Sequence, residues 1–194
     1  MPTSYKKLLL LCYLALCSNV IAQEKKHPAA IPPDGFQFSG LWNCEGAMGN
    51  GKIHKSAFQG ALILDGKWLE LSEQDLEPAT GYVAKYLIGY DSQKERLVEF
   101  DANNFGAAAY TSAEGWTNRV LTMTSPISDG ANAPYSADRF LYSLTDPNTF
   151  IVDWQISQDR GTSWNPEITS SANAERAHDA GVSSLYFFQG SATG

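Results

Sequence analysis

Tyrosines recur along the middle of the chain in a pattern that could build a binding site. Tyr82, Tyr86 and Tyr90 are separated by even numbers of residues, so in a β-strand their rings would lie on one face. A tyrosine ring supplies apolar surface, and its hydroxyl can orient a ligand. We therefore predict that these rings wall a cavity for a small apolar or amphipathic ligand. Solid core packing would produce the same stripe.

The full set of predicted ligand contacts adds aromatic residues from other predicted strands and one arginine. Arg139 is included because an inward guanidinium would pair with a carboxylate ligand, although arginine is more common at exposed positions. The predicted contacts are Trp42, Tyr82, Tyr86, Tyr90, Phe100, Tyr110, Arg139, Tyr142 and Trp154.

Paired carboxylates offer a second kind of chemistry. Glu99 and Asp101 would share one face of a strand, whereas the faces of Glu70 and Asp153 depend on the strand register. Acid–base catalysis needs two carboxyl groups close together in a cleft, with separated pKa values. A hydrolase-type enzyme is therefore one alternative. No catalytic residue is predicted, because carboxylates are most often found at the surface.

Histidine and cysteine are too scattered to predict a metal site. The histidines are His27, His54 and His178, and none of them has a partner at the spacing of a zinc site. Cys44 has no basic neighbour in the sequence and is predicted to be a small buried hydrophobe. We therefore expect no metal and no cofactor.

The segment from Ser157 to Trp164 fits the Asp-box pattern Ser-x-Asp-x-Gly-x-Thr-Trp, with Ser163 in place of the threonine. Copies of this motif recur in sialidase propellers, and a propeller needs several copies. A single copy favours a structural role, in which Asp159 caps a hairpin turn and Trp164 packs beneath it.

A hairpin predicted at Asp65-Gly66 indicates how these side chains are positioned. Two apolar runs flank this pair, which suits a type I′ turn because both residues tolerate positive φ. Folding the chain there pairs Ile63 with Trp68. We assign the leucine face of this hairpin to the protein interior, and Trp68 and Glu70 to the outer wall.

Further strands are predicted where apolar residues alternate between turn signals. The other predicted strands cover residues 38–46, 82–90, 96–100, 104–111, 117–125, 138–144 and 150–157, with a last strand after Gly161. Short turns between successive strands favour an up-and-down meander, which closes into a barrel and so loses its edges. The expected fold is all-β, a single antiparallel up-and-down β-barrel of about ten strands.

The start of the chain resembles a secretory signal peptide. Within residues 1–22, Lys6 and Lys7 precede an apolar run, and Ala22 supplies the small residue of a cleavage site. We therefore expect a periplasmic or secreted protein with no membrane span. A lipoprotein anchored at Cys17 is disfavoured, because Leu16 is not the small residue that lipoprotein processing needs.

The chain is acidic, with a net charge of -7 at pH 7 over 194 residues, and it lacks the Lys and Arg clusters that nucleic acid requires. No nucleic-acid partner is expected. Residues 23–35 are polar and proline-rich and are predicted to be a flexible lead-in. The predicted β-barrel domain covers 36–177, and an aromatic C-terminal tail covers 178–194.

Several short motifs occur in a fixed order between Phe36 and Arg176. They are Gly40-x-Trp42 with Gly46, the Leu-Asp-Gly-Lys-Trp hairpin, Gly89-Tyr90-Asp91, the Asp-x-Gly-x-x-Trp segment and Glu175-Arg176. This order resembles the bacterial domain of unknown function family numbered 1579. The resemblance implies an exported lipocalin-like or nitrobindin-like β-barrel, with Trp42 packed across its closed end, and it implies no catalytic residue.

Nitrobindin-like barrels bind haem through a histidine near the last strand. His178 lies beyond the last predicted strand, and the Tyr-Pro pair of those barrels is missing after the first strand, so we expect no haem. Three functions remain open. The first is a ligand-binding barrel, the second is a non-enzymatic structural or interaction module with a solid core, and the third is the hydrolase-type enzyme.

Overall fold

The chain is an all-β protein in the computed structural model, which describes residues 28–32 and 34–175. That part of the chain contains no helix, and therefore no helix that could cross a membrane. The strands are β1 (Gly40–Met48), β2 (Ile53–Ile63), β3 (Trp68–Glu77), β4 (Val83–Asp91), β5 (Arg96–Asn103), β6 (Gly106–Ser112), β7 (Trp116–Thr117), β8 (Val120–Thr124), β9 (Ala137–Asp146), β10 (Thr149–Ser157) and β11 (Asn165–Ala174).

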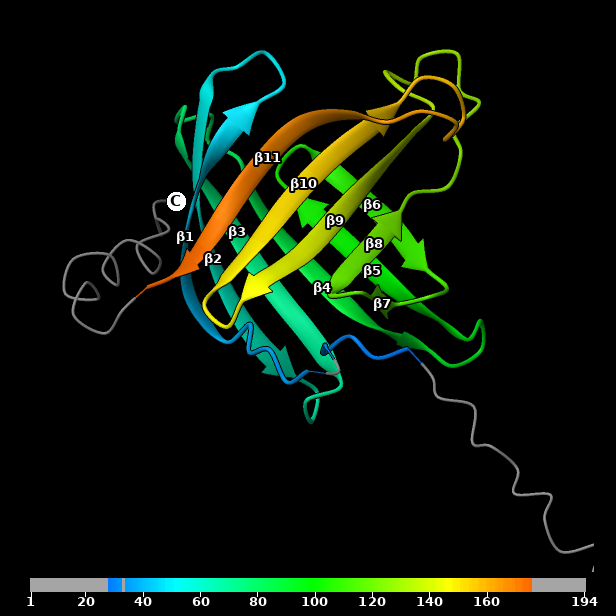
Figure 1. The fold of residues 1–194 in the computed structure, drawn as a ribbon. Helices are drawn as coiled ribbons and strands as arrows, with labels where there is room; N and C mark the ends of the chain where they lie inside the picture. The colour runs from blue at the N-terminus through cyan, green and yellow to red at the C-terminus, as the bar shows by residue number, and fades with distance from the viewer. Residues whose placement is uncertain (1–27, 33, 176–194) are drawn as a thin grey trace, which may run out of the picture.

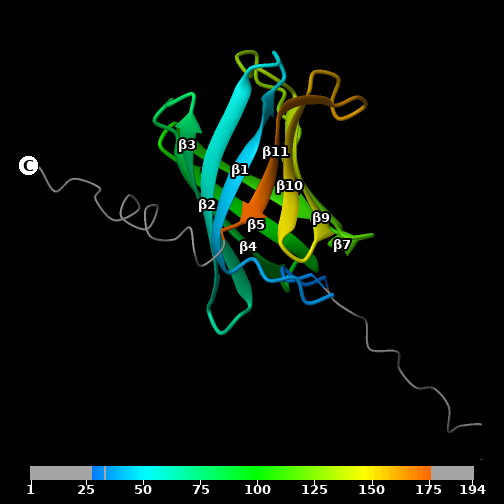
Figure 2. The ribbon, with the colours of Figure 1, turned by 60° about the vertical axis from the view of Figure 1, so that its left-hand side comes forward.

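Ten of these strands close into one antiparallel barrel. Neighbours in the chain pair from β1 to β6 and from β7 to β11, while β1 also pairs with β11 and β6 with β8 (Figure 1). The short strand β7 pairs with β8 and is the one strand left out of the ring. Figure 2 shows β2, β1, β11 and β10 side by side in one wall. The predicted up-and-down barrel of about ten strands is confirmed.

The hairpin of β2 and β3 has the predicted register. Ile63 pairs with Trp68, and the turn residues Asp65 and Gly66 have φ values of 58° and 74°. Glu70 points outward and pairs with Lys85 at 2.7 Å. Leu69 and Leu71, which lie in the barrel wall, are buried as expected. Leu62 and Leu64 are exposed, because the hairpin tip projects beyond the barrel.

The barrel closes through a narrow seam between β6 and β8. The predicted strands 104–111 and 117–125 imply a hairpin around Glu114-Gly115, but Thr111 and Thr124 form the single residue pair between β6 and β8. The chain turns instead at Asn118 and Arg119, where φ is 51° and 65°, and joins β7 to β8. The predicted pairing is therefore wrong. The turn at Asn118 and Arg119 is favoured because it closes a shorter loop than the turn around Glu114 would.

Residues 28–32 and 34–39 lie across one end of the barrel (Figure 1). Ala30 is buried, and its carbonyl oxygen accepts a hydrogen bond of 3.1 Å from Trp116 Nε1. Asp34 forms an ion pair with Arg119. The described part of the predicted lead-in is therefore packed against the barrel, because its apolar residues cover an interior that would otherwise face water.

An aromatic floor fills this closed end of the barrel. We use the word floor for Phe36, Phe38, Trp42, Phe58 and Phe150, whose rings are all buried. The rings of Trp42 and Phe150 meet edge to face at 4.9 Å, and Trp42 Nε1 donates to the Phe38 carbonyl oxygen at 2.9 Å. Trp42 thus lies at the closed end. The floor leaves the opposite end, the mouth, as the place for a site.

Gly60 provides a test of the contact between the barrel and residues 34–39. A Cβ atom at Gly60 would lie 1.9 Å from the Phe38 carbonyl oxygen, so Gly60→Ala forces the backbone of one segment to move. We expect the free energy of unfolding, measured in urea, to fall by about 1–3 kcal/mol. Gly106→Ala is the matched control, because no atom lies within 4 Å of its added Cβ. Equal losses in the two variants would contradict the close approach.

Candidate functional site

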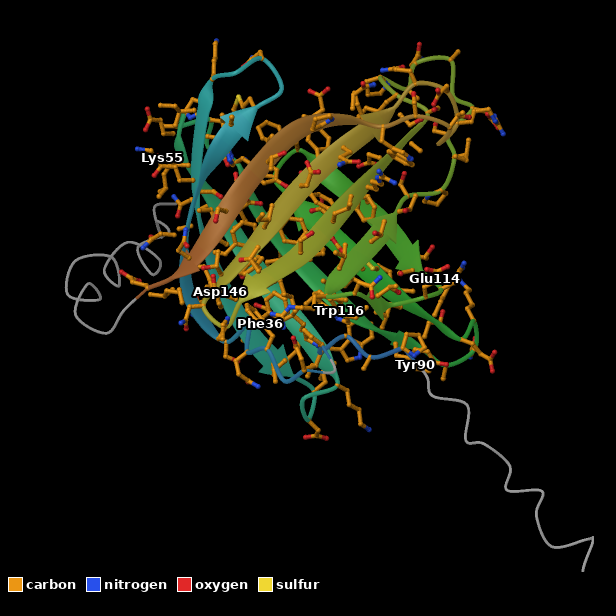
Figure 3. The ribbon with its side chains drawn as sticks, in the orientation of Figure 1. Phe36, Lys55, Tyr90, Glu114, Trp116 and Asp146 are labelled. Atoms are coloured by element: carbon orange, nitrogen blue, oxygen red, sulfur yellow. The ribbon has the colours of Figure 1, made fainter. Side chains whose placement is uncertain are left out.

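The barrel interior changes from apolar to polar between the floor and the mouth. Figure 3 shows Phe36 and Trp116 at the closed end and Lys55 near the opposite end. Because side chains alternate along each strand, every second residue of the wall faces inward. Polar side chains on the inward face include His54, Ser56, Glu73, Asp75, Tyr82, Tyr86, Glu99, Asp101, Tyr110, Asp138, Tyr142 and Ser170.

Glu99 is a fully buried carboxyl group on β5. Its Oε1 accepts a hydrogen bond of 3.0 Å from the Tyr142 hydroxyl, and its Oε2 has no partner. Burial raises the pKa of Glu99 to about 8, and the nearby charges of Asp101 and Asp138 act in the same direction. The Tyr142 hydrogen bond opposes them without overcoming burial. Glu99 is therefore protonated and neutral at pH 7.

Two more carboxyl groups lie beside Glu99. Asp138 Oδ2 accepts hydrogen bonds from Tyr110 at 2.7 Å and from Trp154 Nε1 at 3.2 Å. Asp101 accepts from the amide of Asn103, and burial, helped by the charge of Asp138, raises the pKa of Asp101. We call Glu99, Asp101 and Asp138 the β5–β9 carboxyl group cluster. Among the described residues, no lysine or arginine forms an ion pair with any of the three.

A second polar cluster lies on β2 and β3. His54 Nε2 is 3.0 Å from Asp75 Oδ1, and His54 Nδ1 is 3.0 Å from Ser170 Oγ. The Tyr86 hydroxyl donates to Glu73 Oε2 at 2.6 Å. Burial raises the pKa of Glu73 to about 7, against the effect of the Tyr86 hydrogen bond. His54, Glu73 and Asp75 each offer an atom suited to a metal ion, within 4.8 Å of one another.

Most of the predicted tyrosines face the interior. The hydroxyls of Tyr82 and Tyr86 are 3.0 Å apart, which links them to the second cluster, while Tyr110 and Tyr142 bond to the first. Tyr90 is partly buried and lies toward the closed end (Figure 3). The structure thus brings four of the predicted tyrosines to two groups of carboxylates.

Phe100 lies on the outer wall, which corrects its predicted place at the interior. It is 49% exposed and stacks on Trp68 with a distance of 6.3 Å between ring centroids. The alternation that turns Glu99 and Asp101 inward must turn Phe100 outward. Trp68 also covers Gly89, where an added Cβ would lie 2.2 Å from the indole.

Arg139 also lies on the outer wall, so it is not an interior partner for a carboxylate ligand. Its Nε and Nη2 atoms donate to Gln155 Oε1 at 2.8 and 2.6 Å. Its guanidinium lies 4.2 Å from the centroid of the Trp164 ring. Trp154, another predicted contact, is partly buried and reaches the interior through its bond to Asp138.

The Asp-box segment forms a capped turn between β10 and β11. Asp159 Oδ1 accepts hydrogen bonds of 2.8 Å from the Ser157 hydroxyl and from the Ser163 amide. These hydrogen bonds, that of the Ser163 amide first, lower the pKa of Asp159 to about 2. The expected capping role of Asp159 is confirmed by this geometry.

The residue patterns in the sequence do not predict the second cluster, although the register of β2 with β3 indicates part of it. In the observed pairing of β2 with β3, Ser56 is opposite Asp75 and Phe58 is opposite Glu73. Both pairs follow when the register set by the Asp65-Gly66 turn is extended along the two strands. An irregularity next to Ser56 then shifts the register by one residue, which no sequence pattern announces.

Two surface hollows accompany the barrel. A groove of about 580 Å³ lies along β2 to β5 and includes Gln59, Gln74 and Asn104, and another of about 380 Å³ borders the β6–β8 seam. Neither is walled by the predicted tyrosines. Four of them, Tyr82, Tyr86, Tyr110 and Tyr142, form hydrogen bonds with one another or with interior carboxyl groups instead.

A scan against protein-family models and a search of curated proteins both give no match. The resemblance to family 1579 remains a prediction.

Replacing Glu99 tests its buried, protonated state. Between its ordinary pKa of 4.5 and its folded value of about 8, the folded protein holds a proton that the unfolded chain releases, so stability falls as pH rises. Each pKa unit corresponds to about 1.4 kcal/mol. The free energy of unfolding, measured in urea, should fall between about pH 5 and pH 8 in the wild type. In Glu99→Gln this fall should be smaller by on the order of a few kcal/mol.

Glu114→Gln is the matched control for this experiment, because Glu114 is exposed. It should keep the pH dependence of the wild type. A wild-type slope in Glu99→Gln would show that Glu99 does not hold its proton in the folded state.

Proposed function

We propose that this chain is an exported β-barrel protein that binds a small amphipathic ligand at the barrel mouth, with a protonated amine as the ligand's polar end. The observation that carries the proposal is the β5–β9 carboxyl group cluster, which pairs with no described lysine or arginine. A buried carboxylate is costly without a cation or sufficient hydrogen bonds. A ligand ammonium group would supply both.

Asp138 is the best placed of the three to meet an amine. Both of its side-chain hydrogen bonds end at Oδ2, which leaves Oδ1 for a ligand. Asp101 accepts only from the neighbouring Asn103 side chain. Glu99 is fully buried and neutral, so its role is to hold Tyr142 in place and to limit the negative charge of the cluster.

Aromatic rings beside Asp138 suit the rest of such a ligand. Trp154 and Tyr135 meet edge to face at 6.3 Å, and both remain partly exposed. Their rings offer apolar surface, and an indole face attracts ammonium ions. An alkylammonium chain could therefore place its charge at Asp138 and its apolar part against these two rings.

The packed floor limits how deep a ligand can lie, and it also supports the alternative of a structural module with a solid core. The five floor rings contact one another, so the proposed site is confined to the mouth. A module that binds another macromolecule would use exposed apolar side chains such as Phe105, which is 74% exposed. Binding of a small amine distinguishes the two functions.

A hydrolase-type enzyme is a second candidate, because several carboxyl groups gather in the interior. Burial raises the pKa of Glu99 to about 8, and a carboxyl group that holds its proton at neutral pH can serve as a general acid. Glu99 is fully buried, however, whereas a general acid must reach its substrate. This favours binding over catalysis.

Export and family membership are part of the proposal. The leader at residues 1–22, the possible anchor at Cys17 and the tail at 178–194 lie outside the described residues. The order of the glycine and aromatic motifs supports membership of family 1579, and a lipocalin-like barrel is compatible with it. Fractionation of expressing cells would show the full chain in the cytoplasm if the export proposal is wrong.

A pair of probes of equal length and opposite charge tests the amine site. Decylamine and decanoate are titrated into the full-length chain at pH 7, with tryptophan fluorescence as the readout, because Trp154 contacts Asp138. We expect decylamine to bind more tightly. Asp138→Asn should weaken decylamine binding by about tenfold, the effect of losing about 1.4 kcal/mol from a charged contact.

Asp153→Asn is the matched control, because Asp153 bonds to Thr169 on the outer wall. It should bind decylamine as the wild type does. Equal binding of both probes, or decylamine binding that survives Asp138→Asn, would reject the amine site.

A further inference from the structure

His54, Glu73 and Asp75 form a group that the amine site does not use. They come from β2 and β3, and their nearest ligand atoms lie within 4.8 Å of one another. We propose that these three side chains bind one divalent transition-metal ion inside the barrel mouth. The inference is independent of the proposed amine ligand, because it involves different strands and different carboxyl groups.

Each of the three side chains has a further hydrogen-bond partner outside the group of three. His54 Nδ1 meets Ser170 Oγ at 3.0 Å, Tyr86 donates to Glu73 Oε2 at 2.6 Å, and Thr80 donates to the second oxygen of Asp75 at 2.6 Å. Metal-binding residues in proteins are commonly held by such outer hydrogen bonds, which fix the orientation of the ligand atoms. Here His54 Nε2, Asp75 Oδ1 and Glu73 Oε1 are the atoms that the ion would meet.

Ser56 gives an independent indication that a ligand belongs here. Its hydroxyl is buried, with 1% of the residue exposed, and has no hydrogen-bond partner. It is opposite Asp75 in the strand pairing and lies beside the Glu73 side chain. A buried hydroxyl without a partner is costly. A metal ion, or a water bound to it, would satisfy it.

The donor set indicates the class of ion. One imidazole and two carboxylates carry a charge of about −2, which a divalent cation neutralises, and this combination is found at zinc and related first-row metal sites. Cys44 is the pairing neighbour of Ser56, but its sulfur is not part of the group of ligand atoms that lie within 4.8 Å of one another. Three protein ligands leave a fourth position for Ser56 or water.

Binding of the ion changes the hydrogen bond of His54. Without an ion, Nε2 meets Asp75 Oδ1. With an ion, the Nε2 lone pair points to the metal, Nδ1 carries the proton, and Nδ1–H donates to Ser170 Oγ. Ser170 is therefore a positioning residue. Its replacement should lower the affinity of the site for the metal ion without removing a ligand.

The test uses the full-length chain, stripped with a chelator and titrated with Zn²⁺ in competition with a chromophoric chelator. We expect one Zn²⁺ ion per chain. His54→Gln and Asp75→Asn should each lower the affinity by at least about 100-fold, and Ser170→Ala by about 10- to 100-fold. Co²⁺ added in place of Zn²⁺ should give the intense visible absorption of a four-coordinate site.

Two controls separate this site from other places where zinc could bind. The double variant His27→Gln/His178→Gln removes the histidines outside the described residues and should bind Zn²⁺ as the wild type does. Thr80→Ala changes an exposed side chain, so it tests the site even if the buried variants fail to fold, and it should weaken binding about tenfold. No saturable Zn²⁺ binding to the wild type, or affinity unchanged in Thr80→Ala and Ser170→Ala, would overturn the proposal and leave an ion pair of His54 with Asp75 only.

Discussion

The alternation of side chains along ten closed strands is the constraint on which the rest of this structure depends. A shift of one residue in any strand would exchange its inner and outer sets. In β5 the alternation places Glu99 and Asp101 inside and Phe100 outside. The same rule sends Asp138 inward and Arg139 outward on β9. The acidic character of the interior is therefore a property of the register.

The local turns explain how much of the fold could be predicted from the sequence. Asp65 and Gly66 adopt the positive φ values that their types favour, and the register of β2 with β3 follows from that turn. The β6–β8 seam could not be predicted in this way, because Asn118-Arg119 is a weaker turn signal than a pair containing glycine. The packing of Ala30 under the barrel depends on contacts with residues far along the chain.

Only part of the candidate site could be predicted, because sequence patterns describe one strand at a time. Even spacing within one strand brought Tyr82 and Tyr86 to the interior, but it does not extend across the turn to Phe100, because each strand sets its own phase. His54 and Asp75 are 21 residues apart and meet only through cross-strand pairing. Patterns within one strand show which residues share a face, while the partners across strands require the register of every hairpin.

The seam between β6 and β8 ties the folding of the barrel to the start of the described chain. Ala30 and Asp34 contact Trp116 and Arg119 across separations of 86 and 85 residues. Contacts between such distant residues form late, because a long loop must close before they stabilise the protein. A single residue pair joins β6 to β8, so this seam is the narrowest part of the ring. The segment that precedes the first strand thus holds β7 and the β7–β8 turn in place beside that seam.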